Sequence, residues 1–320
     1  VSDPGSVVSA RELVSQNTLS SGGSEPAVGV EISNAAEFSL HYGLLYQNAG
    51  LGVAVSDIDT LASLKDVVIQ STQVRPDGLW GRGVLISQGA TADFWRVAIM
   101  NNQSIGCLVL GLGSEFTAQD IIIANTETDD DGDNGYGLFI DSGAKGIIHR
   151  VQIHGNQRVG IQMQESELEL FDASVINTIP QNDGSDGQGI YVMLGSMVRG
   201  ERVFMDGNHG TGLHLQDVSS EGHLRDLIVS STQGQLGGDY GRGVSISKGS
   251  NLNLERAYIG QNRELGMGVW DSGTRLEATD LVVRYTQPNP EGKIGRGILV
   301  QDGASVAVQD ADFSMNREIA

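Results

Sequence analysis

The chain has few cysteines, few cations and no long apolar runs. Only one of its 320 residues is cysteine, so no disulfide can form within the chain. Lys and Arg number 20 against 40 Asp and Glu, which gives a formal charge of −20. Such a surface repels phosphates, and no apolar run is long enough for a transmembrane helix. We therefore expect neither nucleic-acid binding nor direct membrane insertion.

Proline and helical periodicity are also scarce. The six Pro residues fall in turns or loops, where a missing N–H does not interrupt a strand ladder. No stretch of about ten residues combines good helix formers with the helical period. The single cysteine, Cys107, stands at an apolar position of the pattern and is predicted to be a buried thiol. These absences favour an all-β chain.

A repeat of about 54 residues runs through the sequence. A Gly-apolar-x-apolar pattern starts at Gly29, Gly83, Gly137, Gly189, Gly243 and Gly297. An Asn follows each of these Gly residues after 19 positions, at Asn48, Asn102, Asn156, Asn208, Asn262 and Asn316. A fixed period of this length indicates a solenoid.

Each repeat consists of two similar coils. Phe94, Val97 and Ile99 in one half match apolar residues 30 positions earlier in the other half. Within a coil the apolar residues alternate with period two, as in Gly83–Ser87, which is typical of strands. We predict a right-handed parallel β-helix of about 12 coils with three short strands each, forming a single domain over 1–320. The spacing around Leu254 also fits a leucine-rich repeat.

Opposite charges alternate at one position of successive coils. The order is Asp66, Arg96, Asp120, Arg150, Asp172, Arg202, Asp226, Arg256 and Asp280. Opposite charges on neighbouring strands attract, and a slip of one coil would bring like charges together. We predict a structural charge ladder that explains why two coils make one repeat. The repeated Asn residues, which alternate with Thr residues such as Thr72, are likewise predicted to stack and to bind turn backbone groups.

Acidic residues gather in one of the loops that follow the Thr positions. Glu127, Asp129, Asp131 and Asp133 lie in a Glu-x-Asp-x-Asp-Gly sequence that resembles the start of a calcium loop. Leu138 stands where a closing Glu is expected. The sequence thus suggests Ca²⁺ as its one candidate cofactor, with a solvated acidic loop as the alternative.

Three larger side chains share one outward position of the repeat. Leu85, Phe139 and Tyr191 could stack on sugar rings or form an exposed dimer patch. The loops of the longer coils leave on one side, and such a row is a usual binding face of repeat proteins.

The repeat resembles two groups of known proteins. The segments Gly241-Arg242-Gly243, Asn262-Arg263 and Asp280–Val283 are similar to large repetitive surface proteins of gliding and predatory proteobacteria. Over nearly the whole chain the pattern also resembles the pectate-lyase-like superfamily, many of whose members cleave acidic polysaccharides. The Arg-x-Lys of polygalacturonase-type hydrolases is missing here. We therefore assign no catalytic residue.

These observations lead to two functional hypotheses. The first is a non-enzymatic extracellular or cell-surface protein, a β-helical stalk, adhesin or filament segment that assembles end to end or laterally or binds another surface protein. Val1 and Ala320 both align with positions inside a coil, so a segment of a longer array is expected. The alternative is a protein that binds or cleaves polysaccharide with the row of loops.

Overall fold

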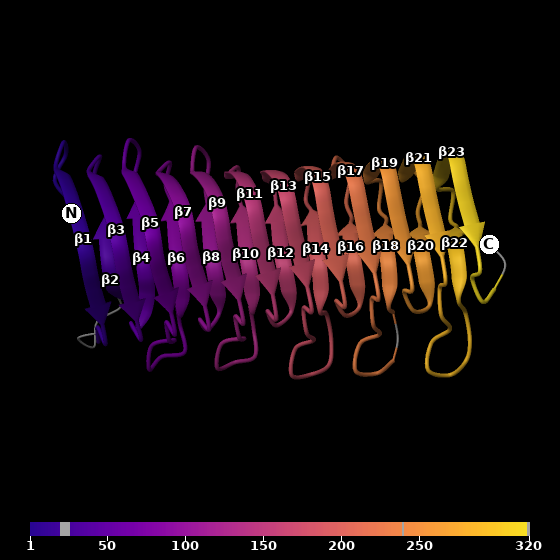
Figure 1. Cartoon of the computed structure of the whole chain (residues 1–320), viewed down its shortest axis with the longest axis horizontal. Helices are drawn as coiled ribbons and strands as arrows, with labels where there is room; N and C mark the ends of the chain where they lie inside the picture. Colours follow the sequence, from indigo (N-terminus) through magenta and orange to yellow (C-terminus); the bar gives the residue numbers. More distant parts are fainter. Residues whose placement is uncertain (20–25, 239, 319–320) are drawn as a thin grey trace. The chain divides into compact units, whose positions relative to one another are not determined.

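The computed structural model describes residues 1–19, 26–238 and 240–318, and most of them belong to strands (Figure 1). The described residues contain 23 strands and no helix. Contacts divide the chain into two units, one formed by Val1–Gln157 with Ser166–Leu168, the other by Arg158–Glu165 with Glu169–Ala320. Within each unit, long and short strands alternate along the chain and each kind forms its own parallel sheet. The predicted all-β, parallel β-helical fold is confirmed.

The first unit stacks ten-residue strands in one sheet and shorter strands in the other. The long strands are β1 (Val7–Gln16), β3 (Glu37–Tyr46), β5 (Leu61–Gln70), β7 (Thr91–Met100), β9 (Glu115–Ala124) and β11 (Lys145–His154). The short strands are β2 (Ala27–Ile32), β4 (Gly50–Ser56), β6 (Arg82–Ser87), β8 (Ile105–Leu110) and β10 (Tyr136–Asp141).

The second unit repeats this arrangement. Its short strands are β12 (Val159–Gln164), β14 (Gln188–Met193), β16 (Thr211–Leu215), β18 (Arg242–Ile246), β20 (Leu265–Val269) and β22 (Arg296–Val300). The long strands are β13 (Glu167–Ile176), β15 (Met197–Asp206), β17 (Glu221–Ser230), β19 (Asn251–Gly260), β21 (Arg275–Arg284) and β23 (Ser305–Ser314). The first two residues of β13 belong to the first unit.

Every long strand is bent at its sixth residue. The φ angle there is positive, for example 55° at Asp66 and 52° at Arg96. Strand pairing skips these two residues: Lys65 pairs with Trp95, and the next pair is Val67 with Val97. A coil therefore contains two strands, one of them bent, where the sequence predicted three separate ones. The alternation of the apolar residues predicts both arms. It does not reveal that pairing resumes directly after the bend, so that both arms belong to one strand.

The core consists of stacked columns of aliphatic side chains. Ile69, Ile99 and Ile123 pair in register on successive strands, and all three are fully buried. Each such side chain contributes about 1.5–3 kcal/mol of hydrophobic free energy relative to an exposed one. Cys107 is buried in a neighbouring column, and burial raises the pKa of its thiol, so it is an inert part of the core.

The repeating Gly residues are required by close packing at one turn. A Cβ on Gly83 would lie 2.6 Å from the carbonyl oxygen of Gly106 and 2.7 Å from Nδ2 of Asn102. These distances are too short for any side chain, so the Gly and Asn columns of the sequence depend on each other.

Candidate functional site

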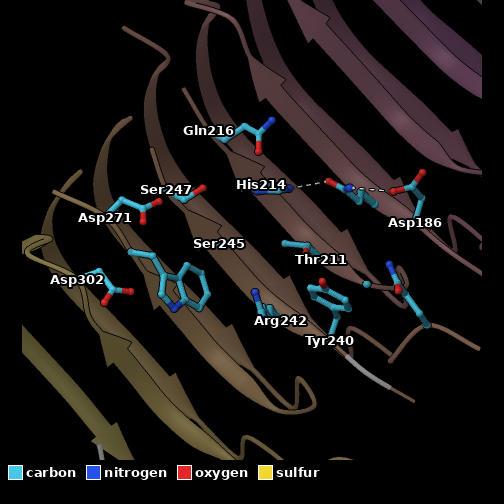
Figure 2. A pocket seen from close by; sticks show the side chains of 14 residues that line it. Asp186, Thr211, His214, Gln216, Tyr240, Arg242, Ser245, Ser247, Asp271 and Asp302 are labelled. Atoms are coloured by element: carbon cyan, nitrogen blue, oxygen red, sulfur yellow. Dashed lines mark hydrogen bonds between the residues drawn. The ribbon is translucent and has the colours of Figure 1, made fainter. Parts of the chain in front are cut away.

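Outward side chains of the short strands of the second unit border a groove of about 490 Å³ (Figure 2). β14, β16 and β18 contribute Gln188, Thr211, His214, Arg242 and Ser245. Further lining residues come from loops and strand ends, namely Asp186, Gly210, Gln216, Gln235, Tyr240, Ser247, Trp270, Asp271 and Asp302. The groove is therefore mostly polar, with two aromatic side chains.

Arg242 lies between these two aromatic rings. Its Cζ atom is 4.6 Å from the ring centroid of Tyr240 and 4.6 Å from that of Trp270. One terminal nitrogen of the guanidinium is 3.5 Å from the carboxylate of Glu264. A planar guanidinium stacks well on aromatic faces, so the three side chains hold one another in place.

Gly268 on β20 provides the space in which Trp270 lies. A Cβ on Gly268 would overlap the six-membered part of the indole, so the ring rests directly against the strand backbone. Gly268 pairs with Ser245 of β18, another residue of the groove. This Gly therefore serves to seat an aromatic side chain on the outer face of the sheet.

His214 connects two neighbouring strands across the groove (Figure 2). Its Nδ1 atom is 3.0 Å from Oε1 of Gln188, and its ring is stacked on that of Tyr191 with 4.6 Å between centroids. Burial, together with the charges of Arg242 and Lys248, lowers the pKa of His214 to about 4. The imidazole is neutral at pH 7, and since an amide oxygen only accepts, Nδ1 carries the proton and Nε2 keeps its lone pair.

Three carboxylates and one guanidinium line the described part of the groove. Asp186 forms an ion pair with Arg158 at 3.1 Å, and Asp271 accepts a hydrogen bond of 2.9 Å from the backbone nitrogen of Lys248. Carboxylate and amide oxygens accept hydrogen bonds from hydroxyl groups, whereas an excess of carboxylates repels a polyanion. The arrangement suits a hydroxyl-rich, uncharged ligand.

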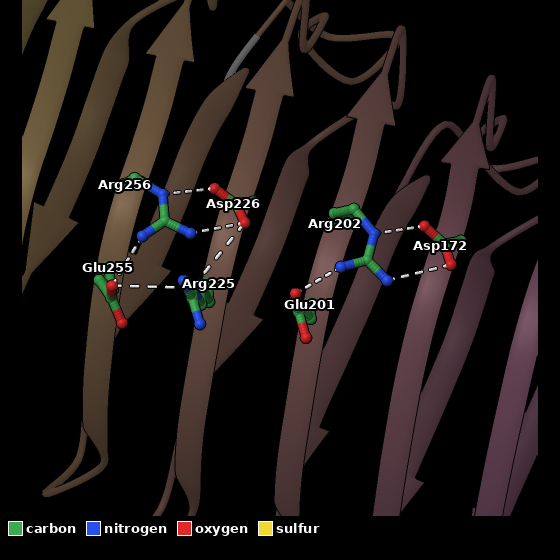
Figure 3. A network of polar contacts seen from close by, with 7 residues as sticks. All are labelled: Asp172, Glu201, Arg202, Arg225, Asp226, Glu255 and Arg256. Atoms are coloured by element: carbon green, nitrogen blue, oxygen red, sulfur yellow. Dashed lines mark hydrogen bonds and ion pairs between the residues drawn. The ribbon is translucent and has the colours of Figure 1, made fainter.

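The residues of the charge ladder form separate ion pairs, each between an Arg and the Asp of the preceding coil (Figure 3). Two nitrogens of each Arg contact one carboxylate, and hydrogen bonding from Arg96 lowers the pKa of Asp66. The shortest distances are 2.5 Å for Arg96–Asp66, 2.6 Å for Arg150–Asp120, 2.5 Å for Arg202–Asp172 and 2.7 Å for Arg256–Asp226. Asp280 has no ion pair within the described residues. The paired arginines are not free to act on a ligand.

The Asn residues bind the backbone of the preceding coil. Oδ1 of Asn156 accepts a hydrogen bond of 2.9 Å from the nitrogen of Thr126, and its Nδ2 donates to the carbonyl of Ile123 at 3.2 Å. Asn48, Asn102, Asn208, Asn262 and Asn316 accept the same bond from Thr18, Thr72, Thr178, Thr232 and Thr286. The amide oxygens of this column are therefore occupied by the fold itself.

One carboxylate of the acidic loop accepts hydrogen bonds from within the loop. Oδ1 of Asp129 accepts a bond of 2.8 Å from the nitrogen of Asp133, and Oδ2 accepts one of 2.6 Å from Asn134. Glu127 pairs through its backbone with Gln103 of the preceding coil. Across the residues that the structure describes, no three His, Cys, Asp or Glu side chains are grouped to hold a metal ion. Calcium binding by Glu127, Asp129, Asp131 and Asp133 stays a prediction.

The three predicted surface residues are divided between the units. Leu85 and Phe139 flank Leu108 on the outer face of the short strands of the first unit, and both are half-buried. Tyr191 lies in the second unit against His214, at the edge of the groove.

Sequence reasoning did not single out Arg242, Tyr240 or Trp270 as a site. A signal was present, because the positions equivalent to Trp270 in other repeats hold Ser56, Leu110 and Gln216. Trp270 is the aromatic residue among these equivalent positions, and a local departure of this kind can mark a site on a repeat protein.

The family described as "Right handed beta helix region" matches residues 113–283. This chain belongs to the right-handed β-helix family. Among solved structures, the β-helix is similar to the periplasmic alginate epimerase AlgG, with a TM-score of 0.60 and 11% identity over 92% of this chain and 80% of that one. The pectate lyase Pel9A aligns with a TM-score of 0.49 and 13% identity over 97% of this chain and 79% of that one. No relative was found among curated protein sequences.

At this level of identity the alginate epimerase shows the fold of the β-helix and not its activity. Within the described residues, nothing forms a helix long and apolar enough to cross a membrane. Because the identity to the epimerase is low, the function of the groove must be inferred from the residues that line it.

Proposed function

We propose that this β-helix binds a polysaccharide along the groove of the second unit and that it prefers uncharged chains. The observation that carries the proposal is the wall formed by Tyr240, Arg242 and Trp270 beside the hydrogen-bond acceptors Asp271 and Asp302. Rigid aromatic side chains supply contact area at little entropic cost, and fixed polar groups supply orientation. A sugar chain has both the flat apolar faces and the hydroxyl groups that such a surface can contact.

The similarity to an alginate epimerase supports a polysaccharide as the ligand, because that protein acts on one in the same fold. The charge of the described lining points to a different class from a polyuronate, since three carboxylates face one guanidinium that is already stacked and near Glu264. The epimerase is periplasmic, which supports a location outside the cytoplasm. Cell fractionation with an antibody against the chain tests that location, and recovery in the cytosol would contradict it.

The binding proposal is tested by a glycan array followed by isothermal titration calorimetry with soluble neutral polysaccharides. Replacing Trp270 with Ala removes one side of the aromatic wall, and we expect affinity to fall by about tenfold or more. The matched control is Trp95→Ala, which removes a partly exposed Trp of the first unit and should leave affinity unchanged. Binding only to polyuronates would contradict the preference for uncharged chains, and no binding to any glycan would reject the function.

A cleavage reaction is the second candidate, favoured by the lone pair that Nε2 of His214 keeps at neutral pH. A neutral imidazole can accept a proton from a bound sugar, although a pKa of about 4 makes His214 a weak base for such a step. We expect binding without turnover, because Arg242 is held by two rings and Glu264 and is not placed to neutralise a uronate carboxylate. Unsaturated or shortened products formed by the natural chain and lost in His214→Gln would establish an enzyme instead.

The passive scaffold is the interpretation that the ladder and the Asn column support by themselves, since both are occupied in holding coils together. It predicts that the natural chain and Trp270→Ala behave alike in every glycan measurement.

A further inference from the structure

An apolar stripe runs across the outer face of the long strands of the second unit, on the arms that follow the bend. Phe204, Ile228, Tyr258 and Val282 occupy paired positions on β15, β17, β19 and β21. Phe204 is 40% exposed and Ile228 is 41% exposed, while the other two are half-buried. Neighbouring exposed apolar side chains of this size are typical of a contact surface.

Charged residues border the stripe on both sides. Along each border, the residue on β15 has the opposite charge to the residue on β21. On the side of the bend, the four strands carry Arg202, Asp226, Arg256 and Asp280. On the other side, β15 ends with Asp206 and β21 ends with Arg284. Reversing the order of the four strands therefore places an acid wherever there was a base, and a base wherever there was an acid.

We propose that this face binds a second copy of the chain, related by a two-fold axis parallel to the strands and passing between β17 and β19. Such an axis lies in the plane of the contact and reverses strand order, so that β15 of one copy faces β21 of the other. Arg202 then faces Asp280 of the second copy, and Asp226 faces Arg256. Phe204 faces Val282 and Ile228 faces Tyr258, so apolar groups meet apolar groups in an isologous interface.

We infer that a second copy of the chain binds this face because the order of charges along the four strands is complementary to its own reverse. Asp280 makes no ion pair within the described residues, and the axis brings opposite it the Arg202 of the second copy, which also holds Asp172 of its own chain. At each end Asp206 lies opposite Arg284, which also forms an ion pair with Asp312 of its own chain.

The corresponding positions of the first unit hold Val14, Leu44, Val68, Ala98, Ile122 and Gln152, a column without an aromatic side chain. The first unit carries the same alternating charges, so the aromatic side chains of Phe204 and Tyr258 are what distinguish the stripe of the second unit.

Four strands make a small interface, so the association should be weak and dependent on concentration. Sedimentation equilibrium over a wide concentration range measures it. We expect a reversible dimer whose dissociation constant rises about tenfold or more in Asp280→Lys, because the introduced ammonium group would face Arg202 of the second copy. The matched control is Glu115→Lys on β9 of the first unit, an exposed acid whose replacement changes the net charge equally and should leave the dimer intact.

A mixing experiment locates the contact. The double variant Asp172→Arg with Arg202→Glu keeps its internal ion pair by exchanging the two charges, yet in its own dimer the introduced carboxylate would face Asp280. Each variant alone should be monomeric. An equimolar mixture with Asp280→Lys should dimerise, because the introduced ammonium of one chain then faces the introduced carboxylate of the other. Thermal unfolding must show both variants folded, and a Phe204→Ser variant gives the same test through the apolar stripe.

A natural chain that stays monomeric at every concentration would overturn the proposal. So would a dimer that Asp280→Lys and Phe204→Ser both leave unchanged, or variants that fail to associate when mixed. Because this face does not include the groove residues, glycan binding by Asp280→Lys should equal that of the natural chain, and the two proposals can fail separately.

Discussion

A single imidazole, His214, links the chemistry of the groove to the stability of the second unit. The same burial that keeps it neutral beside Gln188 makes its protonation unfavourable in the folded chain. In the unfolded chain a His titrates near pH 6.5, so between pH 6.5 and 4 the unfolded state binds more protons. The stability that depends on His214 is therefore fully present above pH 6.5, the pKa in the unfolded chain, and is lost as the pH falls toward 4, the pKa in the folded chain.

We predict that His214→Gln makes unfolding less sensitive to pH across this window. In the natural chain the loss attributable to His214 should reach about 2–3 kcal/mol below pH 4, and the variant should lack it. Urea unfolding at several pH values measures the difference, with His223→Gln, a change in an exposed His of β17, as the control. Parallel pH profiles for the natural chain and His214→Gln would show that the imidazole is not held neutral by the fold.

In alternate short strands, a Gly lies in close contact with the amide of an Asn in the following coil. In the second unit, a Cβ on Gly243 would lie 2.6 Å from the carbonyl oxygen of Gly266. Asn262 also accepts a hydrogen bond of 3.0 Å from the nitrogen of Thr232. No side chain larger than that of Gly fits beside the Asn amide, which explains why both residue types recur in every repeat.

We predict that Gly243→Ala destabilises the chain by about 1–3 kcal/mol, because the added methyl group overfills a packed site. Gly237→Ala is the control, since a Cβ there meets no atom within 4 Å. That change should alter the free energy of unfolding by no more than about 0.5 kcal/mol. Equal effects of the two substitutions in chemical denaturation would mean that the turn is looser than its geometry indicates.

At the scale of the whole molecule, the two-coil repeat is the unit that can be added or removed while every coil still contacts a coil of the other type. Removing residues 67–120 of the first unit would bring Arg150 next to Asp66 and leave Asn156 next to its own partner Thr126, which reproduces the existing pattern. Removing only residues 97–120 would place Arg96 beside Arg150 and leave the nitrogen of Thr72 without an Asn partner. Neighbour interfaces dominate the stability of a repeat protein, so the two deletions should differ.

We predict that the chain lacking 54 residues, 67–120, unfolds at a higher temperature than the chain lacking only 97–120, although it has lost more of its core. Circular dichroism during heating compares the two, and the natural chain provides the reference. A higher midpoint for the shorter deletion would show that neither the charge ladder nor the Asn column sets the repeat length.

The sequence by itself determined the fold, because its Gly, Asn and alternating aliphatic residues recur at fixed intervals and each repeat can bury its apolar side only against the next. Asp66 and Arg96 could be placed in one column for the same reason. The tertiary structure alone decided that Tyr240, Arg242 and Trp270 gather around one groove, since they come from a loop, a strand and a strand end with no common spacing. It also decided how far Phe204 and Ile228 stay exposed on the outer face of the second unit, because the cover that neighbouring side chains give one another depends on their packing in space and not on their order along the chain.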